Sequence, residues 1–177
     1  MIKSARFAAV GVAGATAGAV GTLAMDLLWW RRARRGGDDS RFGEWEFSGD
    51  TGSFDEAAAP AQLGRKVAGA VGVTIPDERA GLTNDVVHWM TGPAYGALGA
   101  VVAAAAGLPP MVAGVGAGVV AFGVAYSVLP TVGLYDPIWA YDVRTVLDDL
   151  TAHLTFGVVT GLVLAGAAAA GHRAAGV

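Results

Sequence analysis

Two histidines in this sequence each open an apolar stretch and are followed by glycines four and eight residues later. The stretches are His88-Trp-Met-Thr-Gly92-Pro-Ala-Tyr-Gly96 and His153-Leu-Thr-Phe-Gly157-Val-Val-Thr-Gly161. Because positions i, i+4 and i+8 share one face of a helix, each stretch presents an imidazole and, beyond it, a smooth strip for another backbone. This repetition predicts two copies of one helical unit inside a membrane, with the four glycines as packing positions.

Carboxylates at helical spacing accompany both histidines. Asp85 precedes His88 by three residues, and Asp149 precedes His153 by four. Each carboxylate can share a helix face with its imidazole, and can then orient it or favour its charged form. Asp26 lies inside the first apolar run, where an ionisable group is costly and is a functional candidate by default. The proton- or pH-linked candidates are therefore Asp26, His88, Asp149 and His153, and the orienting candidates are Asp85 and Asp142.

Other roles for these residues stay open. Carboxylates in the first turn of a helix cap free N–H groups and favour the helix dipole, and interfacial histidines often bond a neighbouring helix. Two histidines with carboxylates can bind a divalent metal, and two facing histidines can ligate a b-type haem if the glycines leave room for the ring. Neither spacing is a known ligand motif, so no resident cofactor or metal is expected.

The composition indicates a membrane protein. Hydrophobic residues make up 54% of the 177 positions, charged residues only 15%, and the mean hydropathy is +0.49, whereas soluble domains carry roughly 25% charged residues. The absence of cysteine excludes disulfides, thiolate metal sites and a cysteine nucleophile. A net charge of −3 gives no electrostatic footprint for nucleic acid. No phosphate loop, Ser-His-Asp set or metalloprotease motif is present, so we expect a non-enzymatic protein whose first partner is the lipid bilayer.

The apolar runs predict four membrane spans, at about residues 7–30, 86–107, 111–129 and 148–171. The first run, of about 24 residues, gives roughly 36 Å of helix, enough to cross a hydrocarbon core of about 30 Å. Basic residues precede it, as in a secretory signal peptide. It ends, however, in two tryptophans and four arginines, which is typical of an interfacial anchor and a cytoplasmic stop, so an uncleaved span is expected. Gly14 and Gly18 form a GxxxG motif inside it.

A polar connection over residues 31–84 separates the first span from the others. Its second part predicts a short surface helix at about residues 61–72, with an apolar stripe of Leu63, Val67 and Val71 that lies on the membrane or against the bundle. The expected fold is a single all-α membrane domain, a four-helix bundle built from two helical hairpins. Its small-residue stripes would also serve a second copy of the chain or a partner in a membrane complex.

The basic residues predict the orientation. The connection over 31–84 and the loop over 131–149 together hold nine, and the opposite side holds three: Arg31, Arg32, Arg34, Arg35, Arg41, Arg65, Lys66, Arg79 and Arg144, against Lys3, Arg6 and Arg173. The excess places the long connection in the cytoplasm and both termini on the non-cytoplasmic side.

Several segments resemble a known family. They are Pro76-Asp-Glu78, Val87-His88-Trp89 with Gly92 and Tyr95-Gly96, Leu129-Pro130 with Gly133-Leu-Tyr-Asp-Pro-Ile-Trp-Ala-Tyr-Asp142, and Asp149-Leu-Thr-Ala-His153 with Phe156-Gly157. Over roughly residues 7–170 the chain is similar to the YagU-like family of bacterial inner-membrane proteins. The resemblance implies a multi-span inner-membrane protein with a link to acid tolerance, and it implies no established reaction and no catalytic residue.

Three functional hypotheses follow. The leading one is a membrane protein that senses or conducts protons during acid stress through a cytoplasmic-side cluster of histidines and aspartates. The second is a cofactor- or metal-binding membrane protein that uses His88 and His153. The third is a packing subunit of a larger membrane complex.

Overall fold

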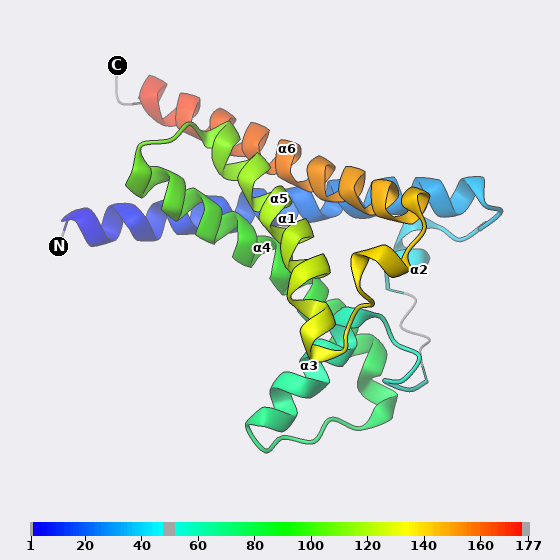
Figure 1. Cartoon of the computed structure of the whole chain (residues 1–177). Helices are drawn as coiled ribbons and strands as arrows, with labels where there is room; N and C mark the ends of the chain where they lie inside the picture. The colour runs from blue at the N-terminus through cyan, green and yellow to red at the C-terminus, as the bar shows by residue number, and fades with distance from the viewer. Residues whose placement is uncertain (1, 48–51, 175–177) are drawn as a thin grey trace.

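The computed structural model describes residues 2–47 and 52–174, and over these ranges the chain is all-α, as the sequence predicts. Six α-helices are present in this part of the chain: α1 (Ile2–Arg35), α2 (Phe42–Glu46), α3 (Ala59–Ala70), α4 (Ala80–Ala106), α5 (Pro110–Ser127) and α6 (Val143–Ala174). Both ends of the chain and the α4–α5 turn lie at one end of the molecule, and α2 lies at the other (Figure 1).

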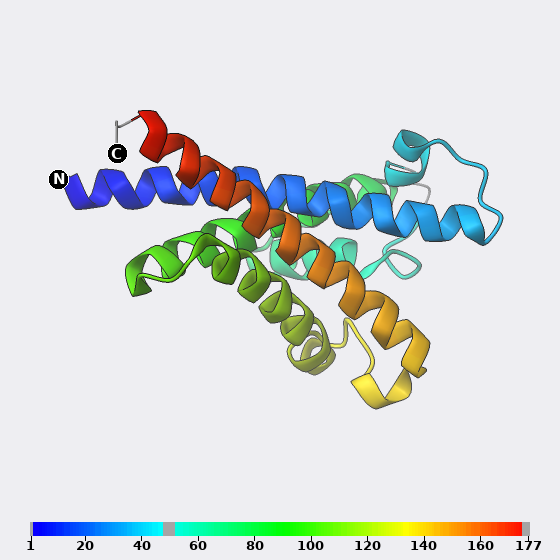
Figure 2. The same cartoon turned by 90° about the horizontal axis from the view of Figure 1, so that it is seen from above.

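The four long helices pack as a bundle. The most extensive contacts join α1 to α4 and α5 to α6, and α6 also lies along α1. Seen from above, α6 crosses α1 obliquely, α4 passes behind α1, and the α4–α5 turn lies to one side (Figure 2). The two expected helical pairs are therefore each in direct contact, and the α1–α6 contact joins them.

Three helices are long and apolar enough to cross a membrane: Ala5–Arg35, Pro110–Val132 and Val143–Gly171. Only 28% to 33% of each apolar window is buried inside the protein, so most of its apolar surface needs lipid around it. Helix α4 has 27 residues, about 40 Å, and is not among the three. It carries Asn84, Asp85 and His88 in its first half and Pro93 near its middle. The chain is thus a multi-pass membrane protein by these criteria.

Glycines form the contact between α1 and α4. A Cβ atom on Gly14 would lie 2.5 Å from the Gly96 carbonyl oxygen and 2.8 Å from the Ala97 Cα, and one on Gly18 would overlap the Gly92 carbonyl oxygen. The two backbones therefore touch directly, in the manner of small-residue contacts between membrane helices. We call this contact the α1–α4 seam.

A second seam of the same kind joins α5 to α6. A Cβ atom on Gly157 would lie 2.8 Å from the Gly114 carbonyl oxygen and 3.3 Å from the Gly118 Cα, and one on Gly161 would lie 3.1 Å from the Met111 Cα. Both seams pair a GxxxG helix with a helix that carries a His-x-x-x-Gly-x-x-x-Gly sequence. The glycines singled out in the sequence thus lie at the closest helix contacts of the bundle.

The short helix α3 packs on the start of α4 through its small residues. Ala61 is fully buried, and a Cβ atom on Gly64 would lie 2.5 Å from Thr83 Cγ2. Within the expected apolar stripe, Val67 is 58% and Val71 75% exposed, whereas Leu63 is half-buried. The small residues of α3 allow it to approach α4 closely. Val67 and Val71 are not part of this contact and their side chains are accessible.

Candidate functional site

The α1–α4 seam brings Asp26 and His88 together. His88 lies one turn before Gly92, and Asp26 lies two turns after Gly18 on the antiparallel partner helix. The His88 Nε2 atom lies 3.0 Å from Oδ1 and 3.1 Å from Oδ2 of Asp26. Asp26 is only 3% exposed, so the imidazole is the partner that compensates for burying this carboxylate.

A third ionisable group reaches the pair from outside the long helices. Helix α2 folds back because the Trp30 Nε1 atom donates to the Ser40 carbonyl at 3.1 Å and the Trp30 and Phe42 rings meet edge to face. In the last turn of α2, Glu46 Oε1 accepts a 2.7 Å hydrogen bond from Trp89 Nε1. One ligand atom each from Asp26, Glu46 and His88 then lie within 4.8 Å of one another.

Sequence reasoning missed Glu46. It lies in a stretch with mixed charge and no period, and nothing local indicates that this stretch returns to the bundle. Burial raises the pKa of the Glu46 carboxyl above its ordinary value, and the nearby Asp26 carboxylate raises it further. Both effects disfavour a second negative charge at the site.

The site carries more negative than positive charge. The single imidazole of His88 interacts electrostatically with three carboxyl groups, those of Asp26, Glu46 and, at longer range, Asp85. Within residues 2–47 and 52–174, neither Asp26 nor Glu46 forms an ion pair with lysine or arginine. Buried carboxylates need a compensating cation, so this arrangement favours binding of a proton or a metal ion.

The other predicted pair, Asp149 and His153, meets within α6. His153 Nδ1 donates to the Asp149 carbonyl oxygen at 2.9 Å and lies 3.6 Å from its carboxylate. The Tyr126 hydroxyl donates to the same carboxylate, and the Phe122 ring lies 5.7 Å from the imidazole. The carbonyl contact fixes the proton on Nδ1 and leaves Nε2 available.

Both histidines line one small cavity between α1, α4, α5 and α6. Its volume is about 60 Å³, and Thr22, Gly92 and Phe156 also line it. This volume has room for a few water molecules, since one water needs about 10–15 Å³. A porphyrin ring does not fit, because opposing helices already fill the faces of Gly92, Gly96, Gly157 and Gly161. The room that the haem alternative needs is therefore absent from this part of the chain.

The two orienting candidates have other hydrogen-bond partners. Asp85 contacts the Asn84 amide at 3.5 Å, while the hydrogen bond to His88 comes from Asp26. Asp142 accepts the Thr145 backbone N–H at 3.0 Å and the Thr145 hydroxyl at 2.7 Å, which is an N-cap arrangement at the start of α6. These hydrogen bonds lower the pKa of the Asp142 carboxyl.

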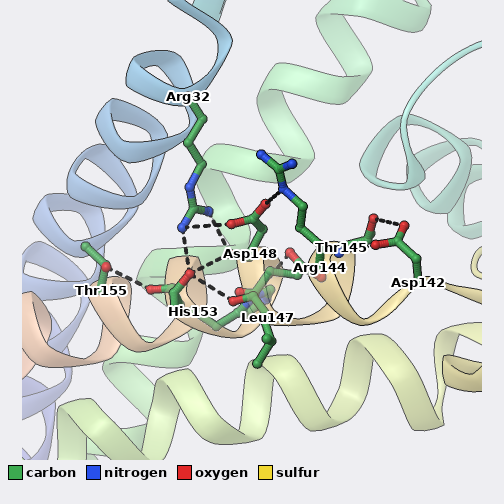
Figure 3. A network of polar contacts seen from close by, with 10 residues as sticks. Arg32, Asp142, Arg144, Thr145, Leu147, Asp148, His153 and Thr155 are labelled. Atoms are coloured by element: carbon green, nitrogen blue, oxygen red, sulfur yellow. Dashed lines mark hydrogen bonds and ion pairs between the residues drawn. The ribbon is translucent and has the colours of Figure 1, made fainter. Parts of the chain in front are cut away.

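One of the four arginines that follow Trp30 ties the end of α1 to the first turns of α6. Arg32 donates to the Asp148 carbonyl oxygen at 2.7 Å and to the Thr151 hydroxyl at 2.6 Å, and it lies 3.5 Å from the Asp148 carboxylate. Arg144 approaches the same carboxylate at 3.8 Å (Figure 3). Arg32 therefore has a packing role at the end of the bundle that holds the His/Asp groups.

A scan against protein-family models and searches of curated proteins and of solved structures gave no match to this chain. The function is therefore inferred from the geometry and charges of the site.

Exchanging Glu46 for glutamine tests the excess of negative charge at the site. A raised pKa means that Glu46 stabilises the fold below its ordinary pKa of 4.5, and that this stability is lost as the pH rises through the higher, folded-state value. Glu46→Gln keeps the acceptor for Trp89, so we expect its thermal midpoint at pH 7.5 to exceed that of the wild type by about 2 °C or less. The difference should vanish towards pH 4.5. Glu56→Gln, at an exposed position, is the charge-matched control, and an equal shift there would contradict the assignment.

Proposed function

We propose that this chain is a multi-pass inner-membrane protein that binds protons at Asp26–His88 and responds to acidification. The observation that supports this most directly is a buried carboxylate, Asp26, hydrogen-bonded to the imidazole of His88 in a site with excess negative charge. Histidine is the side chain whose charge ordinarily changes between pH 5 and 8. The acid-tolerance link implied by the YagU-like resemblance agrees with this proposal, and membership in that family is part of it.

The proposal includes four spans, with α4 as the fourth. The two seams support it, because they have the same pattern of glycines. The α1–α4 seam pairs Gly14 and Gly18 with Gly92 and Gly96, and the α5–α6 seam pairs Gly114 and Gly118 with Gly157 and Gly161. With two hairpins of this kind, α4 and α6 cross in the same direction, as in a parallel repeat. The excess of basic residues near α2 and α3 favours the cytoplasm for that end, and hence the outside for both termini. The exposed valines of α3 would then lie on the inner membrane surface.

The shared cavity supplies a mechanism. Protonation of His88 beside Asp26 makes a stronger, charge-assisted pair. Protonation of His153 as well places two cations on the walls of a cavity of about 60 Å³. The charged groups that face them are Asp26 from α1, Glu46 from α2, Asp85 from α4 and Asp149 from α6. Ions in so small a space need hydration, and this need would separate α4 from α6 at this end and admit water from the cytoplasm.

Distance measurements across the bundle test this mechanism, and the cysteine-free chain makes labelling simple. Spin labels at Val86→Cys and Leu147→Cys, both exposed positions near the site, should move apart between pH 7.5 and pH 5. In the His88→Gln/His153→Gln background this change should be lost. A pair at the opposite end, Val102→Cys with Leu162→Cys, should change little and serves as the control.

Proton flux is the second readout. Proteoliposomes with an entrapped pH-sensitive dye should dissipate a pH gradient faster than empty liposomes. The double histidine variant should fall to the level of empty liposomes. Unchanged label distances together with unchanged flux in that variant would overturn the proposal.

A second candidate function, divalent-metal binding, is favoured by the three ligand atoms of Asp26, Glu46 and His88. Two carboxylates and one imidazole suit manganese, cobalt or zinc. His88 and His153 could alternatively bridge an ion through their shared cavity. Stoichiometric metal in purified protein that is lost in Glu46→Gln would favour the three-residue site, and loss only in His153→Gln would favour the histidine pair. A metal-free preparation that takes up no added Mn²⁺ or Zn²⁺ would exclude both.

A further inference from the structure

A large apolar cavity lies at the opposite end of the bundle from the His/Asp site. Its volume is about 680 Å³, and segments of α1, α4, α5 and α6 line it, including Ala9, Ala104, Leu108, Leu164 and Ala167. This volume is within the range of small-molecule sites, which run from about 300 to 1,000 Å³. The cavity exists because alanines on all four helices are too small to fill the space between them. We call it the terminal vestibule, because it lies beside both chain termini.

The inner end of the terminal vestibule is closed. Ala100, Ala103, Ala113 and Leu164 are each at most 8% exposed and pack together with Ala17 in one cluster. The α1–α4 seam begins immediately beyond, at Gly14 and Gly96. A ligand can therefore enter only from the end of the bundle or from the lipid beside it. The cavity has no second opening into the apolar core.

Arg6 is the one charged side chain among the residues that line the vestibule. It is exposed, and in the described part of the chain it forms no ion pair or hydrogen bond with another side chain. Residues 2–25, 86–135 and 150–174 contain no aspartate or glutamate. No carboxylate in these segments competes for the guanidinium, which favours an anion at the mouth.

Two chemical requirements define the occupant. The walls offer almost no polar partner, so the part that enters must be apolar, and burial of apolar area drives it in. The guanidinium group of an arginine matches a phosphate group in bidentate geometry, so Arg6 suits a phosphate at the mouth. We propose that the terminal vestibule binds an anionic phospholipid, with one acyl chain in the cavity and the phosphate on Arg6. This site is independent of the proposed proton site.

Mass spectrometry of protein extracted from bilayers tests this assignment. The full chain is reconstituted in equal amounts of phosphatidylglycerol and phosphatidylcholine, extracted in mild detergent, and analysed for retained lipid. We expect one phosphatidylglycerol per chain in preference to phosphatidylcholine. Arg6→Gln should lower this retention about fivefold, because one basic residue contributes about 1 kcal/mol of attraction to anionic lipid. Arg173→Gln changes the same charge at an exposed residue outside the lining and is the matched control.

A second pair of variants separates the acyl chain from the headgroup. Ala9→Phe fills the vestibule and should remove retained lipid of both kinds, whereas Ala8→Phe, on the exposed side of α1, should not. Size-exclusion profiles show whether each variant is folded. Equal retention in Arg6→Gln and the wild type, equal amounts of both lipids, or full retention in folded Ala9→Phe would each overturn the proposal.

Discussion

Replacement of Gly18 by leucine is expected to abolish the folded bundle. A Cβ atom there overlaps the Gly92 carbonyl oxygen and lies 3.0 Å from the Pro93 Cα. Both contacts are with backbone, so no side-chain rotation relieves them and α1 must move away from α4. Overpacking of a core that can relax costs about 1–3 kcal/mol, and a rigid contact costs more. We expect loss of the monodisperse peak in size-exclusion chromatography and a thermal midpoint too low to measure.

Gly116→Leu is the matched control. It makes the same exchange in α5, where a Cβ atom meets nothing within 4 Å. Leucine also has a higher helix propensity than glycine, so this variant should be at least as stable as the wild type. Gly118→Leu, at the second seam, should behave like Gly18→Leu because its Cβ atom overlaps the His153 carbonyl oxygen. A stable, monodisperse Gly18→Leu protein would show that α1 and α4 do not approach as closely as described.

Local periodicity made much of this fold predictable. Long apolar runs indicate membrane helices because the bilayer sets their length, and glycines at steps of four indicate a face on which a backbone can pack. Both signals need only a few turns of one helix. The long helices over residues 7–30, 111–129 and 148–171 follow from them, with ends that extend beyond the apolar cores.

The contacts of the site depend on distant parts of the chain, and periodicity does not report these. The shared helix face of Asp85 and His88 predicts that Asp85 orients the imidazole, yet Asp26, sixty-two residues away, makes the hydrogen bond. Glu46 arrives through the fold-back of α2, which depends on the Trp30 contacts. The outward valines of α3 show the same limit, because an apolar stripe indicates an interface without indicating whether protein or lipid covers it.

A double-mutant cycle on Asp26 and His88 should give the second largest effect. His88→Ala leaves the 3% exposed Asp26 carboxylate without its imidazole, and breaking a buried pair in this way costs about 3–5 kcal/mol. Asp26→Asn should cost less, since it leaves no buried charge. The double variant should recover much of the His88→Ala loss, a coupling of up to about 3 kcal/mol between the two sites. Unfolding of detergent-solubilised protein gives the free energy of unfolding of the wild type, both single variants and the double variant. Strictly additive losses of this free energy would contradict direct pairing.

An apolar pair at the same positions distinguishes stability from function. Buried ion pairs replaced by well-packed apolar residues often give equal or greater stability, by about 1–4 kcal/mol. Asp26→Leu/His88→Leu should therefore fold at least as well as the wild type, while the pH-dependent separation of the labelled α4 and α6 should disappear. A variant that is both stable and insensitive to pH would mean that the pair is retained for proton binding at a cost in stability. If the variant is stable and still responds to acid, the proton that triggers the response binds at His153, the remaining histidine of the shared cavity.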